Sequence, residues 1–381
     1  MDPIVVIGTG LAGFNLVKEL RKLDKDTPVV MLTADDGRNY SKPMLSNGFA
    51  KGKSADDLAL AQPEQTAEQL NVEIRTGVMV TGIDRDKRQV LLGDDSLSYS
   101  KLVLAWGAEV FQPPVEGDGL DRVYTVNDLT DYGRFRDALQ GCKKVLIVGG
   151  GLIGCEFAND LTTGGFEVHV VEPVGRCLPT FIPEPASEAV ADGLREQGVT
   201  FHFGPLVKQV DKQGDGVIAT LSDGNTVEAD IVLSAVGLRP RIAMAERAGL
   251  SVNRGIVVNR LLQTDDENIF ALGDCAEVEG NVLLYVLPLM AAARALAKTL
   301  AGEATQVQYG VMPVTIKTPA CPVVCSVPPQ GLDGEWEYEI DGRNVKALFR
   351  DTSGQLRGYA LTGDAVSEKM KLNKELPPIL A

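Results

Sequence analysis

The sequence predicts an α/β protein in which two three-layer units precede a small α+β domain. The first observation behind this prediction is a glycine-rich motif that occurs twice, as GTGLAG at residues 8–13 and as GGGLIG at residues 149–154. The second is context, because each motif follows a short apolar run and precedes a helical pattern. In such a βαβ unit the glycines let backbone approach a pyrophosphate at a helix N-terminus, where unpaired N–H groups and the helix dipole favour anions.

Two motifs in the same context are far more specific than one, so we expect two Rossmann-like dinucleotide-binding domains. The residues expected at the first pyrophosphate are Gly8, Thr9, Gly10, Leu11, Ala12 and Gly13. Those expected at the second are Gly149, Gly151, Leu152, Ile153 and Gly154.

Length and composition agree with a multidomain globular protein. The chain has 381 residues, more than one hydrophobic core usually supports, with 44% hydrophobic and 23% charged residues. Its formal charge of −15 argues against nucleic acid or an anionic membrane as the main partner. The N-terminus lacks the basic region of a signal peptide, and the six cysteines form no secreted-type framework, so a cytoplasmic location is expected.

The first unit continues with a helix at residues 14–23 and a strand at residues 29–33. In an NAD site an acidic residue at the end of that strand holds the adenosine ribose, but here the strand ends in Thr33 and Ala34. Residues 72–110 alternate short strands and turns and lead through Ala105 and Gly107 to Pro113. Pro113 and Pro114 are expected to form a linker.

The second unit has the acid that the first lacks. Its second strand, residues 168–171, is followed by Glu172, which lies twenty-three residues after Gly149. A carboxylate there accepts hydrogen bonds from the ribose 2′-hydroxyl and repels a 2′-phosphate, which predicts NADH rather than NADPH, although the nearby Arg176 weakens the preference. The unit closes at a strand that leads to Gly237.

The remaining chain returns to the first unit and then forms the tail domain. An apolar strand near residue 270 delivers Gly273 and Asp274, and a helix is expected from Pro288 to Leu300. We expect a FAD-type unit at residues 1–110 and 239–305, an NADH-binding unit at 111–238, and an α+β domain at 306–381. Cys321 and Cys325 lack redox spacing and are expected to be buried, while His169 and His202 are expected to be structural.

The motifs resemble those of the two-dinucleotide-binding-domain FAD/NAD(P)H oxidoreductases. The resemblance rests on the two glycine motifs, Ala105-Trp106-Gly107, Glu156 after the second motif, and Leu272-Gly273-Asp274. Lys42-Pro43 without a cysteine pair is similar to the ferredoxin-reductase and rubredoxin-reductase branch. Residues 40–46, 151–158, 312–322 and 372–377 are most similar to bacterial rubredoxin–NAD reductases.

The resemblance implies a role for individual residues. It places FAD on the first motif, with Thr33 and Ala34 near the adenosine and Val80 against the adenine. It implies Lys42 and Pro43 beside flavin N5, and a catalytic pair between Lys42 and Glu156. It further implies Asp274 on the ribityl-phosphate side, with Val286 and Lys317 at the pyrimidine end. No metal is implied.

The function implied is electron transfer from NADH through FAD to rubredoxin, feeding a hydroxylase such as alkane hydroxylase. Ferredoxin as the acceptor and an NADH-sensing flavoprotein remain alternatives. A disulfide, peroxide or oxygen reductase needs a redox cysteine or a His–Glu pair, and the Lys42 region and the two histidines supply neither. Because the chain and rubredoxins are both acidic, docking requires a local patch, for which Lys369, Lys371 and Lys374 are candidates. A solvated charged tail is the competing interpretation of these lysines.

Overall fold

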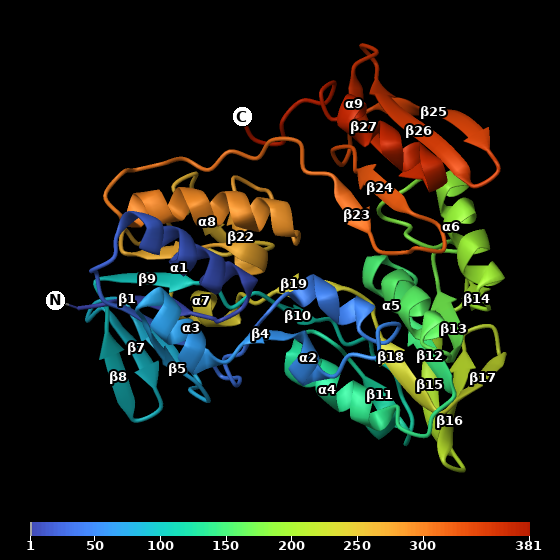
Figure 1. Cartoon of the computed structure of the whole chain (residues 1–381), viewed down its shortest axis with the longest axis horizontal. Coiled ribbons are helices and arrows are strands. Elements are labelled where there is room, and N and C mark those ends of the chain that lie inside the picture. The colour runs from blue at the N-terminus through green and yellow to red at the C-terminus, as the bar shows by residue number, and fades with distance from the viewer. Residues whose placement is uncertain (1) are drawn as a thin grey trace.

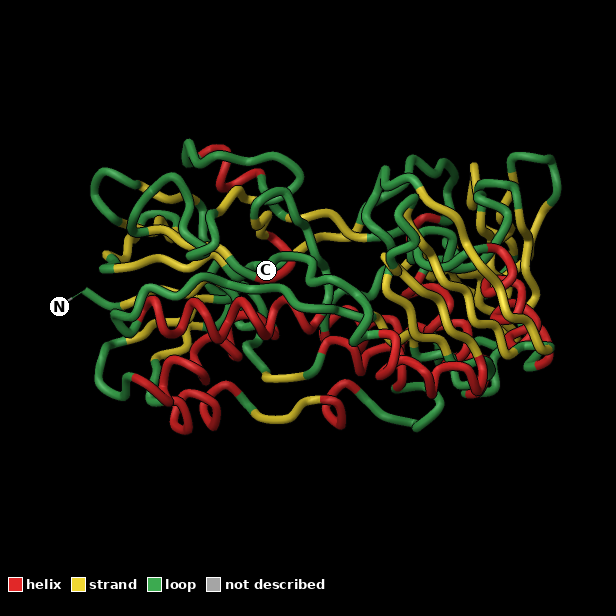
Figure 2. Tube along the Cα trace, turned by 90° about the horizontal axis from the view of Figure 1, so that it is seen from above, coloured by secondary structure: helices red, strands yellow, loops and turns green. Residues whose placement is uncertain are grey.

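The computed structural model describes residues 2–381, so Met1, the first residue of the expected FAD-type unit, lies outside the described residues. It shows three lobes: one built on the first glycine motif, one on the second, and a C-terminal lobe beside the second (Figure 1). Seen from above, the molecule is elongated, with the N-terminus at one end (Figure 2). Within residues 2–381, no helix is both long enough and apolar enough to cross a membrane.

The first lobe is built on a five-stranded parallel sheet in the order β21-β9-β1-β2-β5. Its strands are β1 (Ile4–Ile7), β2 (Val29–Leu32), β5 (Glu73–Arg75), β9 (Lys101–Leu104) and β21 (Ile269–Ala271). Helices α1 (Leu11–Leu23) and α8 (Val286–Leu300) pack together over this sheet (Figure 1). Its other elements are α3 (Pro63–Leu70), β6 (Gly82–Asp84), β7 (Gln89–Leu92), β8 (Asp95–Ser98), α7 (Ala243–Arg247), β20 (Ile256–Val258), η3 (Gly273–Cys275) and β22 (Ala276–Val278).

The second lobe repeats this architecture with the order β11-β18-β12-β13-β14. Its strands are β11 (Val123–Tyr124), β12 (Lys144–Val148), β13 (Glu167–Glu172), β14 (Thr200–Phe203) and β18 (Ile231–Ser234). An antiparallel sheet of β15 (Val207–Gln213), β16 (Gly216–Leu221) and β17 (Thr226–Ala229) accompanies it, with the helices η2 (Leu120–Arg122), α4 (Leu129–Ala138), α5 (Leu152–Thr163) and α6 (Glu184–Glu196). An antiparallel ribbon of β10 (Ala108–Val110) and β19 (Leu238–Pro240) carries the chain between the two lobes.

The third lobe is an antiparallel sheet in the order β23-β24-β27-β26-β25, and α6 packs against β26 and β27. Its elements are β23 (Val314–Ile316), β24 (Val323–Ser326), β25 (Gly334–Asp341), β26 (Asn344–Asp351), β27 (Leu356–Thr362), η4 (Gly363–Glu368) and α9 (Lys369–Leu372). The C-terminal residues return to the first lobe, where Leu380 forms a β-bridge with Tyr309. The α/β class with two similar units and an α+β tail, expected from the sequence, is confirmed.

One segment departs from the sequential arrangement of the lobes. It contains β3 (Asn39–Tyr40), η1 (Lys42–Asn47), α2 (Ala55–Leu58) and β4 (Ala59–Ala61). Leu45, Phe49 and Leu58 belong to the hydrophobic core of the second lobe, together with Tyr132 and Phe135 of α4. The Tyr132 hydroxyl also donates to the Lys53 carbonyl (2.7 Å). Residues 39–61 therefore precede the second lobe in sequence but pack with it.

Two helices begin earlier than expected, for the same physical reason. The first expected helix begins at Leu11 rather than residue 14, and the last at Val286 rather than Pro288. The first-turn N–H groups of a helix have no intrahelical acceptor, so glycine and proline are tolerated there. Sequence punctuation therefore placed both helix starts too late.

Candidate functional site

The two glycine motifs form nearly identical turns at the carboxyl ends of β1 and β12. Gly8 has φ +115° and Gly149 has φ +104°, a region that side chains rarely adopt. A Cβ atom on Gly8 would lie 2.3 Å from the Ala105 carbonyl oxygen, and one on Gly149 would lie 2.6 Å from that of Ala235. Both turns therefore require glycine for conformation and for close approach to the neighbouring strand exit.

The later glycines in each motif serve packing and access. A Cβ atom on Gly13 would lie 2.0 Å from the Gly8 oxygen, and one on Gly154 would lie 1.9 Å from the Gly149 oxygen, so helix and turn pack closely. Gly10 and Gly151 have no neighbour within 4 Å of such an atom. They are the N-cap residues of α1 and α5, and neither helix has a side-chain cap. Open space beside uncapped N–H groups fits a pyrophosphate at both turns.

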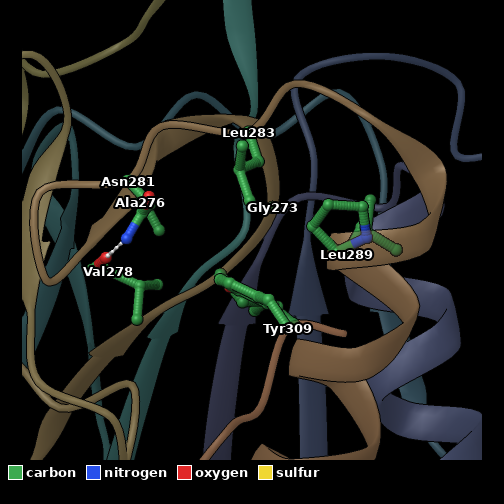
Figure 3. A pocket seen from close by; sticks show the side chains of 9 residues that line it. Gly273, Ala276, Val278, Asn281, Leu283, Leu289 and Tyr309 are labelled. Atoms are coloured by element: carbon green, nitrogen blue, oxygen red, sulfur yellow. Dashed lines mark hydrogen bonds between the residues drawn. The ribbon is translucent and has the colours of Figure 1, made fainter. Parts of the chain in front are cut away.

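The predicted residues of the first unit converge at the carboxyl edge of its sheet. Ala105 and Gly107 follow β9, while Gly273 and Asp274 follow the adjacent β21. A Cβ atom on Gly273 would lie 2.8 Å from the Cβ of Ala12, which places the exit of β21 against the first motif. Figure 3 shows a small cavity at this junction, where Gly273 lies with Leu289 of α8 and Tyr309. Val286 begins α8 at the same edge.

The end of β2 differs chemically from the end of β13. The Gly8 N–H donates to the Leu32 carbonyl and the Gly149 N–H to the Val171 carbonyl, both at 2.8 Å. The residues that follow these acceptors, Thr33 and Glu172, therefore occupy equivalent positions. Thr33 is buried, and its hydroxyl donates to Asp35 (2.6 Å), while Ala34 is exposed and Val80 is buried.

Glu172 is buried beside the second motif. Its Oε2 accepts the Gly150 N–H (2.7 Å) and its Oε1 accepts the Val174 N–H (2.9 Å). Arg176 points elsewhere, because its guanidinium donates to the Pro179 carbonyl (3.2 Å). Gly237 lies just past the exit of β18, beyond Ala235. Two backbone N–H groups therefore hold the Glu172 carboxylate beside the second motif.

Lys42 does not pair with Glu156, so the predicted Lys42–Glu156 pair is wrong. The Lys42 ammonium donates to Asn127 Oδ1 (2.8 Å), and Asn127 in turn donates to the Ala108 carbonyl (3.0 Å). Burial lowers the pKa of Lys42, and attraction to Asp274 partly opposes this. Burial likewise raises the pKa of Asp274, opposed by Lys42. Asp274 is therefore the carboxylate that attracts Lys42 most strongly, ahead of Asp128 and Asp131.

Glu156 pairs instead with Lys317 from the third lobe. The carboxylate is 2% exposed, and its Oε1 accepts the backbone N–H of Lys317 (2.9 Å). Its Oε2 forms an ion pair with the Lys317 ammonium and accepts a hydrogen bond from the Ser46 hydroxyl (2.6 Å). Pro43 lies in the first turn of η1. Lys42 at the start of that turn faces Asn127, which precedes α4, whereas Ser46 further along η1 faces α5. This rotation along η1 explains why Lys42 misses Glu156.

Two residues that the sequence reasoning missed therefore belong to the site: Ser46 and Asn127. No local spacing in the sequence indicates either contact, because the partner of each residue lies 85 or more positions away. Cys321 and Cys325 are buried, as expected. His169 and His202 contact each other across β13 and β14 (3.0 Å), and their structural role stays a prediction. In the part of the chain that the structure describes, all six cysteines are free thiols.

Comparison with known proteins identifies the class. The pyridine nucleotide-disulphide oxidoreductase model matches residues 2–299, and the rubredoxin binding C-terminal domain model matches residues 306–376. A rubredoxin-NAD(+) reductase from Alcanivorax borkumensis is 66% identical over 381 residues, covering all of both chains. One from Acinetobacter baylyi is 43% identical over 395 residues, covering 100% of this chain and 99% of the relative. The crystal structure of a ferredoxin reductase from Rhodopseudomonas palustris superposes with a TM-score of 0.88 at 27% identity, covering 99% and 96% of the two chains.

The chain belongs to the pyridine nucleotide-disulphide oxidoreductase family. Within that family its place is among the rubredoxin-NAD(+) reductases. This membership confirms the oxidoreductase class and the use of FAD and NAD(H) that the sequence predicted. The match of the third lobe agrees with rubredoxin as the expected partner.

Proposed function

We propose that this chain transfers electrons from NADH through FAD to rubredoxin. The observation that carries the proposal is the asymmetry between two otherwise equivalent glycine turns, since the residue that follows the second strand is Glu172 in the second unit and Thr33 in the first. The first turn then holds FAD and the second holds exchangeable NADH. FAD, when bound, accepts a pair of electrons as hydride and releases them singly.

The residues proposed to hold FAD lie around the first turn. Gly10 leaves room for its pyrophosphate, and the uncapped N–H groups of α1 would bind that anion. Lys42 and Asp274 attract each other electrostatically at the carboxyl edge, where Lys42 would lie beside flavin N5 and Asp274 on the ribityl-phosphate side. The positive dipole end of α8 at Val286 would favour the negative charge that the pyrimidine ring gains on reduction.

The Glu156–Lys317 pair is proposed to lie between the two nucleotides. Glu156 is on α5, four residues after the start of that helix at the second glycine turn, and its carboxylate contacts Ser46 of η1 and Lys317 of the third lobe. Lys317 provides a positive charge at that point, and the carboxylate keeps this charge compensated while it is partly buried. We therefore transfer the catalytic role predicted for Lys42 to Lys317, with Glu156 retained.

Docking of rubredoxin is proposed to use the third lobe. Lys369 and Lys371 lie on α9 and Lys374 just after it, and Lys371 and Lys374 are exposed. Among the ion pairs of residues 2–381, none involves these three lysines. Unpaired positive charge on a chain of net charge −15 supports them as a local patch for an acidic partner. Electron-transfer rates that do not fall with added salt would argue against the patch.

The function is tested by offering three acceptors side by side. The flavin is first reduced anaerobically with NADH in a stopped-flow instrument, and rubredoxin, a ferredoxin or glutathione disulfide is then added. We expect fast reoxidation by rubredoxin and none by glutathione disulfide. Ferredoxin is the second candidate acceptor, because a ferredoxin reductase shares the whole fold. Reduction by NADH without transfer to either iron protein would instead favour an NADH-sensing flavoprotein.

Three broader assignments remain proposals. We place the protein in the cytoplasm, supported by its free thiols within residues 2–381. We assign reduced rubredoxin to a hydroxylase such as alkane hydroxylase, which reconstitution with that enzyme tests. We also keep the domain boundaries at residues 110, 238 and 305, supported by the β10–β19 ribbon beside the first two.

A further inference from the structure

A buried serine links the two charged members of the proposed hydride-transfer site. Ser46 is 3% exposed. Its hydroxyl donates to Glu156 Oε2 (2.6 Å) and accepts a hydrogen bond from the Lys317 ammonium (3.0 Å). The hydroxyl thus donates one hydrogen bond to this ion pair and accepts one from it. The two bonds together give the hydroxyl a single defined orientation.

The position of this hydroxyl is fixed by contacts on both sides of it. Leu45 precedes it in the buried core of the second lobe. The backbone N–H groups of Phe49 and Ala50 both donate to the Asp160 carboxylate, at 3.0 and 2.9 Å. Asp160 lies one helical turn after Glu156 on α5, so the same helix holds the segment and presents the carboxylate. Ser46 therefore approaches Glu156 from a rigid support.

We propose that Ser46 is a positioning residue for hydride transfer, acting by fixing the geometry of the Glu156–Lys317 pair. The Lys317 backbone N–H restrains Oε1, and the Ser46 hydroxyl restrains Oε2, so together they set the plane of the carboxylate. Without the hydroxyl, the carboxylate rotates about its last torsion and the ammonium loses one acceptor. This inference rests on the proposed function, because it assumes that the pair lies beside bound FAD.

The network also joins three parts of the chain. Ser46 belongs to η1, Glu156 to α5 and Lys317 to the strand exit that follows β23. A purely structural serine would contribute to stability alone, whereas a positioning serine also alters the chemistry of the pair, and the two roles are separated by measuring both.

The test is Ser46→Ala in the FAD-loaded protein. We expect NADH to reduce the flavin roughly tenfold more slowly, since loss of one such hydrogen bond costs about 1.4 kcal/mol or more. The pH profile of this rate should also differ from that of the wild type, because the Ser46 hydroxyl no longer donates to the Glu156 carboxylate. The flavin midpoint potential should fall by up to about 30 mV, the shift that a tenfold change in the equilibrium constant produces for a two-electron couple.

Three further variants make the result decisive. Ser46→Thr keeps the hydroxyl and should restore the pH profile. Ser54→Ala, in the same segment, removes the N-cap of α2 and should affect stability only. In a Glu156→Gln background, Ser46→Ala should have a smaller effect on rate and potential, since the charged carboxylate that the hydroxyl orients is gone and only its contact with Lys317 remains.

The proposal is overturned if Ser46→Ala leaves the rate, pH profile and potential unchanged, or if its effect persists undiminished in the Glu156→Gln background. Flavin absorbance reports this step without rubredoxin. Failure of the wild-type protein to accept electrons from NADH would therefore refute the proposed function, whereas normal reduction with an unaffected Ser46→Ala variant refutes only the role of the serine.

Discussion

The two glycine turns share a backbone, yet the strands beside them end in different chemistry. The turn glycines, their φ angles and their close contacts match almost atom for atom. At the equivalent positions Thr33 and Glu172, however, one side chain is a hydroxyl bonded to Asp35 and the other a carboxylate bonded to the turn itself. On the proposed assignment of the nucleotides, the backbone geometry forms the pyrophosphate site, while one side chain at the end of the next strand selects the nucleotide.

The largest expected effects come from placing an acid in each turn. Gly10→Asp and Gly151→Asp should both fold, because each position is an open N-cap and aspartate is a favourable N-cap residue. The new carboxylate occupies the N–H groups and repels a pyrophosphate. Loss of two hydrogen bonds to a charged group, about 3 kcal/mol or more, corresponds to roughly 100-fold in affinity.

The two variants should separate the sites. Gly10→Asp should yield protein without FAD absorbance, whereas Gly151→Asp should retain FAD and show an NADH KM raised roughly 100-fold. Absorbance spectra and steady-state kinetics with ferricyanide measure both. Loss of FAD from Gly151→Asp alone would reverse the proposed assignment of the nucleotides.

The second comparison concerns the lysines that serve each site. Lys317→Met should leave Glu156 as a buried, unpaired carboxylate and destabilise the fold by about 3–5 kcal/mol. The loss should lie at the low end of this range, because the Lys317 side chain is 26% exposed. Lys42→Met should cost less, because among the described residues Lys42 forms a hydrogen bond with the Asn127 amide and attracts Asp274 without forming an ion pair with it. Urea unfolding of both variants gives the two free energies. Equal losses would mean that Lys42 and Asp274 stabilise the fold as much as Lys317 and Glu156 do.

These lysines show where sequence reasoning stopped. The glycine turns, the acid at residue 172 and the paired α/β units follow from short-range spacing, which is why they were predictable. The identity of the lysine beside Glu156 depends on a 161-residue separation and on which side of η1 faces α5. The packing of residues 39–61 on the second lobe was equally invisible, because buried Leu45 and Phe49 carry no sign of which core they join.

A smaller change should follow from making the two strand ends alike. Glu172→Thr copies the residue found at the equivalent position of the first unit. The substitution removes the carboxylate that repels a 2′-phosphate and that accepts the Gly150 N–H. The preference for NADH over NADPH should therefore fall about tenfold, which corresponds to about 1.4 kcal/mol. The ratio of kcat/KM for the two nucleotides measures it. An unchanged ratio would place the selectivity elsewhere, with Arg176 the first residue to examine.

The smallest expected effect is a loss of folding stability at low pH. This loss should arise in the second unit alone, because both histidines of the chain lie on β13 and β14. Burial, and then the neighbouring His169, lower the pKa of His202 from 6.5. The unfolded chain therefore binds more protons at this group, and stability should fall as pH drops below 6.5 through the lower folded value.

His202→Gln should reduce that loss of stability. We expect melting temperatures at pH 7.5 and 5.5 to differ between wild type and variant by less than about 4 °C, the shift that 1 kcal/mol produces in a domain of 150–250 residues. An identical acid response in the variant would show that carboxylates, shared by both units, govern acid unfolding instead.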